Sequence, residues 1–156
     1  MVGCGGDTIS DGGYKTLVRG NWIETDQYGI YCNRCERSLY DGNMIFTDDQ
    51  GIHLENGINV TVMKNLIMGG QYGLKSGDAS EGNKIKDNVL IGDAGTDAGV
   101  SVNDDSSSGL LVQGNIVVDS ADLGFELEQD DANTKDLVIR DNLALGNVNA
   151  GLSVPK

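Results

Sequence analysis

Apolar residues recur along most of the chain as pairs two positions apart, and polar or glycine-containing stretches separate the pairs. Side chains two positions apart point to the same face of a β-strand, so each pair predicts a short strand with one buried face. No long segment repeats its apolar residues with the 3.6-residue period of a helix. The pattern therefore predicts an all-β protein made of many short strands.

The strand pattern returns six times between residues 14 and 156. Successive copies are 22, 22, 23, 27 and 27 residues apart when they are aligned on a recurring Asn. A recurring Gly follows later in each copy, and we call these two positions the Asn column and the Gly column. The Asn column is Asn21, Asn43, Asn65, Asn88, Asn115 and Asn142, and the Gly column is Gly29, Gly51, Gly73, Gly99, Gly124 and Gly151.

Each repeat predicts three strands, which we name pre-Asn, post-Asn and Gly-led. Apolar residues occupy the positions three before and two after each Asn, and one and three after each Gly, with Ser76 as an exception. These positions predict the inward side chains. We expect the Asn to bend the chain in the left-handed conformation, with its amide bonded to the Asn of the next repeat. We expect the Gly to allow the turn into the third strand.

With its Asn column and Gly column, this repeat resembles the parallel β-helix repeat of the pectate-lyase-like superfamily. The resemblance covers residues 14–156 and implies a right-handed parallel β-helix of about six coils, with three short strands per coil. We expect one domain over residues 1–156, in which residues 1–13 form a Gly-rich lead-in. A leucine-rich repeat is the alternative fold, because it also carries an Asn column, but the Leu-x-x-Leu of its consensus is absent.

Acidic residues outnumber basic ones by 24 to 11, which gives a net charge of −13. Nucleic acid and anionic membrane surfaces both attract Lys and Arg, so this balance argues against either partner. No segment approaches the roughly 20 apolar residues of a membrane span. Residues 1–13 lack the basic start and the apolar run of a signal peptide, so we expect a cytoplasmic protein.

Cys32 and Cys35 form a Cys-x-x-Cys pair. Cys32 falls at an inward position, where a thiol acts as a small apolar filler. A zinc site would need two more ligands, and the chain offers only Cys4 and His53. We therefore expect neither metal binding nor redox chemistry at this pair.

The family resemblance implies that ligands lie on the outer face of the Gly-led strands. The outward positions place His53 between Tyr31 and Lys75 of the neighbouring coils, with Glu55 on the same strand as His53. These four residues are the candidate catalytic groups, because they could abstract a proton next to a uronate or act as an acid–base pair on a glycoside. A solvated sheet face with alternating charges is the alternative interpretation. The candidate binding residues are Asp48, Asp49, Tyr72 and Glu126.

A separate acidic cluster follows the later Gly-led strands, and its candidate metal ligands are Asp104, Asp105, Glu128 and Asp130. Stacked coils would bring these oxygens together, and Ca²⁺ prefers six to eight oxygen ligands. No Asp-x-Asp-x-Asp-Gly loop is present, and solvated turns are the alternative interpretation. Ca²⁺ is thus a candidate ligand, and we expect no required cofactor.

The post-Asn strands carry apolar residues on the side that should face solvent. The positions one and three after each Asn point outward, yet eleven of these twelve residues are apolar. Such a surface usually marks an interaction site, and we expect a homodimer or larger assembly through it. A covering terminal segment is one alternative, and stacking of open coil ends is a competing route to assembly. The candidate interface residues are Trp22, Met44, Phe46, Leu66, Met68, Ile91, Ile116 and Leu145.

Two functions fit these features. The first is a non-catalytic, self-associating binding or interaction protein with affinity for polysaccharide. Six coils are few beside the enzymes that the fold resembles, and no catalytic pattern is complete. The second is a small polysaccharide lyase or glycoside hydrolase that uses the outer face of the Gly-led strands.

Overall fold

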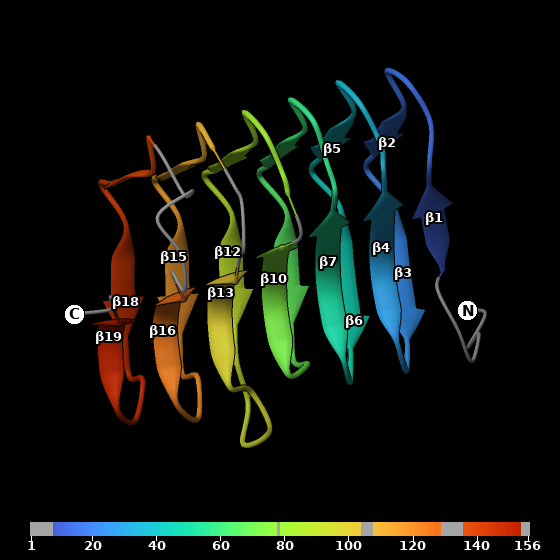
Figure 1. The fold of residues 1–156 in the computed structure, drawn as a ribbon. Coiled ribbons are helices and arrows are strands. Elements are labelled where there is room, and N and C mark those ends of the chain that lie inside the picture. Colours follow the sequence, from blue (N-terminus) through green and yellow to red (C-terminus); the bar gives the residue numbers. More distant parts are fainter. Residues whose placement is uncertain (1–7, 78, 104–107, 129–135, 154–156) are drawn as a thin grey trace.

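The computed structural model describes residues 8–77, 79–103, 108–128 and 136–153, and these ranges contain nineteen β-strands. The strands wind into a solenoid whose coils stack side by side, from β1 at one end to β19 at the other (Figure 1). The prediction of a right-handed parallel β-helix of about six coils, with three strands per coil, is confirmed. None of the described segments forms a helix with the length and apolar character needed to cross a membrane.

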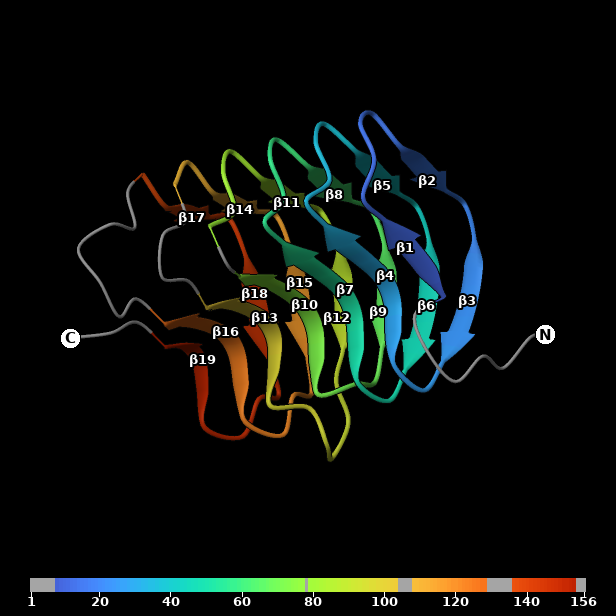
Figure 2. The same cartoon turned by 45° about the vertical axis from the view of Figure 1, so that its right-hand side comes forward.

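Three parallel sheets form the walls of the solenoid (Figure 2). The pre-Asn sheet consists of β2 (Leu17–Arg19), β5 (Leu39–Asp41), β8 (Thr61–Met63), β11 (Lys84–Lys86), β14 (Leu111–Gln113) and β17 (Val138–Arg140). The post-Asn sheet consists of β3 (Trp22–Thr25), β6 (Met44–Thr47), β9 (Leu66–Met68), β12 (Val89–Ile91), β15 (Ile116–Val118) and β18 (Leu143–Leu145). The Gly-led sheet consists of β1 (Ile9–Asp11), β4 (Tyr28–Asn33), β7 (Gln50–Glu55), β10 (Tyr72–Gly77), β13 (Ala98–Asn103), β16 (Leu123–Glu128) and β19 (Ala150–Ser153).

Strand β1 is an element that the repeat pattern does not contain. It lies in the stretch that we interpreted as a lead-in, and it pairs in parallel with β4, so that Ile9 is in register with Ile30. The Gly-led sheet therefore has seven strands where the other two sheets have six.

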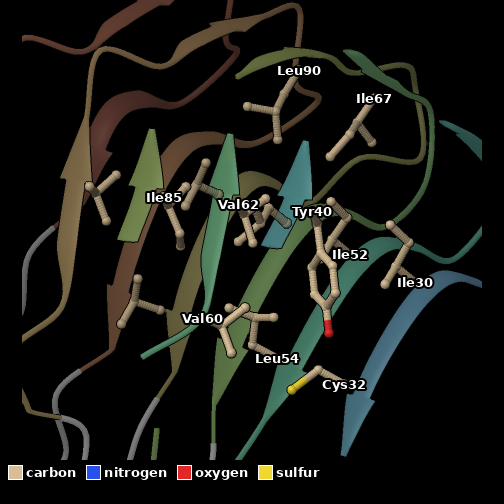
Figure 3. Close-up of a cluster of buried hydrophobic side chains, with 14 of the residues drawn as sticks. Ile30, Cys32, Tyr40, Ile52, Leu54, Val60, Val62, Ile67, Ile85 and Leu90 are labelled. Carbon is tan, nitrogen blue, oxygen red and sulfur yellow. The ribbon is translucent and has the colours of Figure 1, made fainter. Parts of the chain in front are cut away.

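The core runs along the solenoid axis and is built from the inward columns of all three sheets. Its residues are almost completely buried, because each side chain packs on its counterpart in the coils above and below (Figure 3). Among the largest buried side chains are Ile30, Ile45, Ile52, Leu54, Ile67, Leu74, Ile85 and Leu90. Ser76 is also fully buried, so an inward position with a polar residue still faces the core.

The side chains of the Asn column form a continuous chain of hydrogen bonds along the solenoid. The Nδ2 of Asn43 donates to the Oδ1 of Asn65 at 2.9 Å, and the Nδ2 of Asn65 donates to the Oδ1 of Asn88 at 2.9 Å. The backbone N–H groups of Asn43 and Asn65 donate to the same oxygens, and the Nδ2 of Asn65 also donates to the carbonyl of Tyr40. These amides are buried, and the bonds satisfy them without water.

The expectation that the Asn itself takes the left-handed conformation is wrong. The residue before each Asn has the positive φ, which is 64° at Gly20, 56° at Lys64 and 58° at Asp141. This residue makes the bend, because the Asn must keep its backbone N–H and its amide aligned with the next Asn. Three of the six bends use Gly, which adopts this conformation without steric cost.

The positions of the Gly column need Gly because a Cβ atom would not fit there, and not because the backbone conformation is unusual. None of its members is among the residues with positive φ. A Cβ atom at Gly73 would lie 2.6 Å from Cδ2 of Leu90 and 2.8 Å from the carbonyl oxygen of Gly99. The Gly therefore lets the strand pass close to the core and to the next coil, which corrects the turn that we expected it to supply.

A polar cluster and a disulfide lie at the N-terminal end of the core. Cys32 and Cys35 are joined by a disulfide and are fully buried, so Cys32 is inward as expected but does not remain a thiol. The hydroxyl of Tyr40 donates to Oδ2 of Asp11 at 2.7 Å. Burial favours the protonated form of Asp11, but hydrogen bonds from Tyr40, Thr16 and the Gly13 backbone outweigh it, so the pKa of this carboxyl is lowered.

Replacing Asn65 by Leu should lower the free energy of unfolding by about 1–3 kcal/mol, because it leaves buried partners in the Asn column without hydrogen bonds. The measurement is a urea denaturation curve. Asn21→Leu is the control, since Asn21 is exposed and its side chain donates to Asn43 at the end of the column, and its loss should be smaller. An unchanged midpoint for Asn65→Leu would contradict this role of the Asn column.

Lys64→Gly should raise the free energy of unfolding by about 0.5–1 kcal/mol. The left-handed conformation costs an ordinary residue about 1–2 kcal/mol, and Gly removes this cost. About half of the resulting stabilisation is lost, because Gly gives the unfolded chain more conformational freedom. Lys86→Gly is the control, because Lys86 is inside strand β11 and the same change there should destabilise the protein. A loss of stability in both variants would show that the bend is not strained.

The Asp11–Tyr40 pair makes stability depend on acid pH. Because the pKa of Asp11 is lowered in the folded protein, its contribution is present above the unfolded pKa of 3.8 and is lost as pH falls through the folded pKa. Tyr40→Phe should cost about 1.5–3 kcal/mol at neutral pH, and the cost should shrink as pH falls through the lowered pKa of Asp11 and this carboxyl is protonated. Urea curves at a series of pH values test this, and a cost that is constant with pH would contradict it.

Candidate functional site

The outer face of the Gly-led sheet brings the four candidate catalytic residues together. Strand pairing places Tyr31 in register with His53, and His53 in register with Lys75. Glu55 follows on the strand of His53 and is in register with Asn33. Tyr31, His53, Lys75 and Glu55 are all half-buried, so each is partly accessible from solvent.

Three rings pack together at the N-terminal end of this face. Tyr28, the first residue of β4, stacks on Tyr31 with 5.2 Å between ring centroids. The ring of His53 lies edge-on to Tyr28 at 5.5 Å and is tilted against Tyr31 at 5.4 Å. His53 is therefore held by aromatic packing. We call Tyr28, Tyr31 and His53 the aromatic cluster.

The charged and polar groups around the aromatic cluster are also held in place. The Nζ of Lys75 lies over the ring of Tyr72, 5.0 Å from its centroid, which is a cation–π contact. The Nδ2 of Asn33 donates to the hydroxyl of Tyr31 at 3.3 Å. The candidate binding residue Tyr72 thus lies on this face, together with the candidate catalytic groups.

Gln50 is a residue of this face that the sequence analysis did not select. Strand register places it between Tyr28 of one neighbouring coil and Tyr72 of the other. The side chain is only 7% exposed, and among the described residues none bonds to its Oε1. The signal was available, because Gln50 directly precedes a member of the Gly column, as the two tyrosines do.

The other three candidate binding residues lie away from the aromatic cluster. Asp48 is exposed and lines an open pocket of about 450 Å³ with Glu24, Asp26 and Asp93, at the edge of the post-Asn sheet. Asp49 is half-buried, and its carbonyl accepts the backbone N–H of Tyr72. Glu126 is two coils beyond Lys75 along the Gly-led sheet, where Ser101 donates to its Oε2 at 3.0 Å.

The predicted calcium ligands are only partly within the described ranges. Asp104, Asp105 and Asp130 lie outside them, and only the backbone of Glu128 is described, at the end of β16. Within the described ranges, no three or more His, Cys, Asp or Glu side chains gather as metal ligands would.

The eight candidate interface residues lie on the outer face of the post-Asn sheet. Their inward neighbours, such as Ile23, Ile45 and Ile67, are buried in the core. Trp22 is 66% exposed and Leu145 is 49% exposed at the two ends of the face. The rings of Trp22 and Phe46 contact each other across β3 and β6, with centroids 4.8 Å apart.

A solved structure with a similar fold is that of an alginate lyase from Paenibacillus sp. str. FPU-7. The two chains are 17% identical and superpose with a TM-score of 0.77, and the match covers 92% of this chain. The chain spans about half the length of that lyase, 55%. At this identity the likeness shows the shared β-helix fold. A search of curated proteins gives no match.

A family model described as "Periplasmic copper-binding protein (NosD)" matches residues 6–156. The description places this family in the periplasm, so the expectation of a cytoplasmic protein is wrong. The buried Cys32–Cys35 disulfide agrees with this correction, since disulfides persist in oxidising compartments such as the periplasm. A match over nearly the whole chain shows that the protein belongs to the NosD family.

Proposed function

We propose that this protein is a non-catalytic, self-associating β-helix that binds polysaccharide on the outer face of its Gly-led sheet. The observation that carries the proposal is the group of partly accessible rings of Tyr28, Tyr31 and Tyr72 on this face, with the amide of Gln50 between Tyr28 and Tyr72. The alginate lyase with a similar fold is named for a polysaccharide, which agrees with this ligand class.

The face offers both kinds of contact that a sugar needs. A tyrosine ring combines an apolar surface, which packs on the C–H groups of a pyranose, with a hydroxyl that forms hydrogen bonds. Tyr28 and Tyr31 on β4 and Tyr72 on β10 provide three such rings, and strand β7 lies between these two strands. The Oε1 of Gln50 has no hydrogen-bond partner among the described residues, and because it is buried, a sugar hydroxyl would donate to it only after a neighbouring side chain moved aside.

Charge favours a neutral polysaccharide over a polyuronate. The chain carries a net charge of −13, which repels an anionic polymer at moderate salt concentrations. On this face, Lys75 is in register with His53 and Ser101, and Glu55 is one strand away. One lysine does not offset the charge of the whole molecule.

Catalysis at the same face is the alternative function, carried by Tyr31, His53, Lys75 and Glu55. Its supporting observation is their adjacency in register. A glycoside hydrolase usually needs two carboxyl groups that flank the scissile bond, and this group contains one. His53 packs against two tyrosine rings and Lys75 lies over a third, so both contribute to the binding surface that we propose.

The family description also raises copper binding, and the described His, Cys, Asp and Glu residues do not form a copper site. Copper prefers thiolate, thioether and imidazole ligands. The sulfurs of Cys32 and Cys35 are joined in a buried disulfide, and His53 is the single His of the sequence. Within the described ranges, no three potential His, Cys, Asp or Glu ligands gather. The proposed function therefore takes no step through copper.

Tyr28→Ala and Tyr72→Ala should each weaken binding to a soluble neutral glycan about tenfold, because one stacking contact of about 1.4 kcal/mol is lost. Gln50→Leu should weaken binding while it leaves the fold intact. Isothermal titration calorimetry with a neutral glucan, a mannan and alginate measures these changes. Trp22→Ala is the matched control, because it removes an aromatic ring from a different sheet, and it should bind a short neutral glycan as the unmodified protein does.

The same incubations distinguish binding from catalysis. Binding without new reducing ends or unsaturated products supports the proposal. Product formation that falls about 10²–10⁴-fold in His53→Ala would establish the catalytic alternative instead. Equal affinities in Tyr28→Ala, Tyr72→Ala and the unmodified protein would exclude this face as the binding site.

A further inference from the structure

The outer face of the post-Asn sheet is a continuous strip with two outward residues per coil. Eleven of its twelve residues are apolar, and Glu24 is the exception. We call this surface the apolar strip, and its members are Trp22, Glu24, Met44, Phe46, Leu66, Met68, Val89, Ile91, Ile116, Val118, Leu143 and Leu145.

In the described part of the chain, no strand packs over the apolar strip, because all nineteen strands belong to the three walls of the solenoid. Trp22, Ile91, Ile116 and Leu145 are exposed. A sheet with one face in solvent usually alternates apolar and polar residues along each strand. The post-Asn sheet instead has apolar residues on both its inner and its outer face. Such a surface is typical of a site that another protein surface covers.

The size of the residues changes along the apolar strip. Bulky, flexible or aromatic side chains occupy the first three coils, with Trp22 in contact with Phe46 and with Phe46 in register with Met68. Branched aliphatic residues occupy the last three coils, as with Ile91, which is in register with Val118. The strip therefore has its two largest side chains, Trp22 and Phe46, at one end of the solenoid.

From this gradient we propose that two copies of the chain associate through their apolar strips with their solenoid axes antiparallel. The inference rests on the self-association in the proposed function and goes beyond it by fixing the orientation. A two-fold axis parallel to the strands places coil one against coil six, coil two against coil five and coil three against coil four. Trp22 then faces the coil of Leu143, and Phe46 faces the coil of Ile116, so bulky residues meet smaller ones along the whole contact.

The alternative two-fold axis, parallel to the solenoid, is disfavoured by packing. It places each coil against its own copy, so that Trp22 and Phe46 meet their equivalents while Ile116 and Val118 meet theirs. The sheets would then be held apart at one end and leave a gap at the other. Well-packed interfaces resemble protein interiors in density, so only the antiparallel arrangement closes the strip along its length.

The area of the apolar strip suits a stable dimer. Six strands about 4.8 Å apart, each about 10–13 Å long, give a face of about 290–370 Å² per copy and about 580–750 Å² for the pair. Apolar atoms make up about 56–58% of a typical interface, so the whole contact would bury about 1,000–1,300 Å². This reaches the lower end of the roughly 1,200–2,000 Å² of specific complexes.

The first experiment is light scattering on the eluting protein at micromolar concentration. The unmodified protein should have a mass of about twice 16.5 kDa. Phe46→Glu with Met68→Glu should give a monomer with an unchanged circular dichroism spectrum, because charge replaces apolar contact at the centre of one half of the strip. Leu39→Glu with Thr61→Glu is the matched control, since these two residues are in register on the outer face of the pre-Asn sheet, and it should remain a dimer.

The second experiment measures the orientation by spin-label distances within the dimer. Gln27 and Gln71 are both exposed, occupy equivalent turns in coils one and three, and are replaced singly by Cys in a Cys4→Ser background. In the antiparallel dimer the Gln27 labels are offset by five coils, about 24 Å along the axis, and the Gln71 labels by one coil, about 5 Å. Equal distances at the two positions would overturn the antiparallel arrangement.

Four further outcomes decide between the inference and the proposed function. A monomer for the unmodified protein would overturn the inference, as would assemblies that persist in Phe46→Glu with Met68→Glu, which indicate end-to-end stacking. The monomeric variant should keep its affinity for a neutral glycan that is too short to bridge two binding faces, because the aromatic cluster is on another sheet. A dimer without glycan affinity would leave the interface standing and reject polysaccharide binding.

Discussion

Every feature of this molecule depends on parallel hydrogen bonding between successive coils, which fixes their spacing at about 4.8 Å. At that spacing each residue lies directly above its counterpart in the next coil. Each column must therefore hold residues whose side chains can pack on, or hydrogen-bond to, a residue of the same type. Buried aliphatic side chains do so by packing, and the amides of Asn43, Asn65 and Asn88 do so by accepting and donating in the same direction. The Gly column leaves room for the carbonyl oxygen of the next coil.

The three walls of the solenoid share this core and differ in what they present outside. The Gly-led sheet presents rings and polar groups that hold one another, such as Tyr28 with His53 and Lys75 with Tyr72. The post-Asn sheet presents the apolar strip. A contact through the strip leaves the aromatic clusters of both copies accessible, so a dimer would have two glycan-binding faces and gain affinity for long polymers by bivalent attachment.

Periodicity predicts the columns of this fold well, because each column is sampled six times. Register follows from the columns, so the adjacency of Tyr31, His53 and Lys75 is also predictable. What the sequence leaves undetermined are features that occur once. Strand β1, the disulfide at Cys32 and the buried Gln50 depend on particular contacts at one level of the solenoid. The position of the bend is also undetermined by the sequence. Asn and the Gly that precedes it in three of the six coils both adopt a positive φ readily, so either could make the bend.

The direction of the Asn column has a consequence for construction. Each Asn accepts from the preceding coil and donates to the next one, as Asn65 does between Asn43 and Asn88. The same hydrogen bond between Asn side chains therefore connects each pair of neighbouring coils. A duplicated segment such as residues 43–64 would enter this series with both of its faces matched, and would lengthen the solenoid by about 4.8 Å. The distance between two surface groups could therefore be changed in steps of one coil by adding or removing whole repeats.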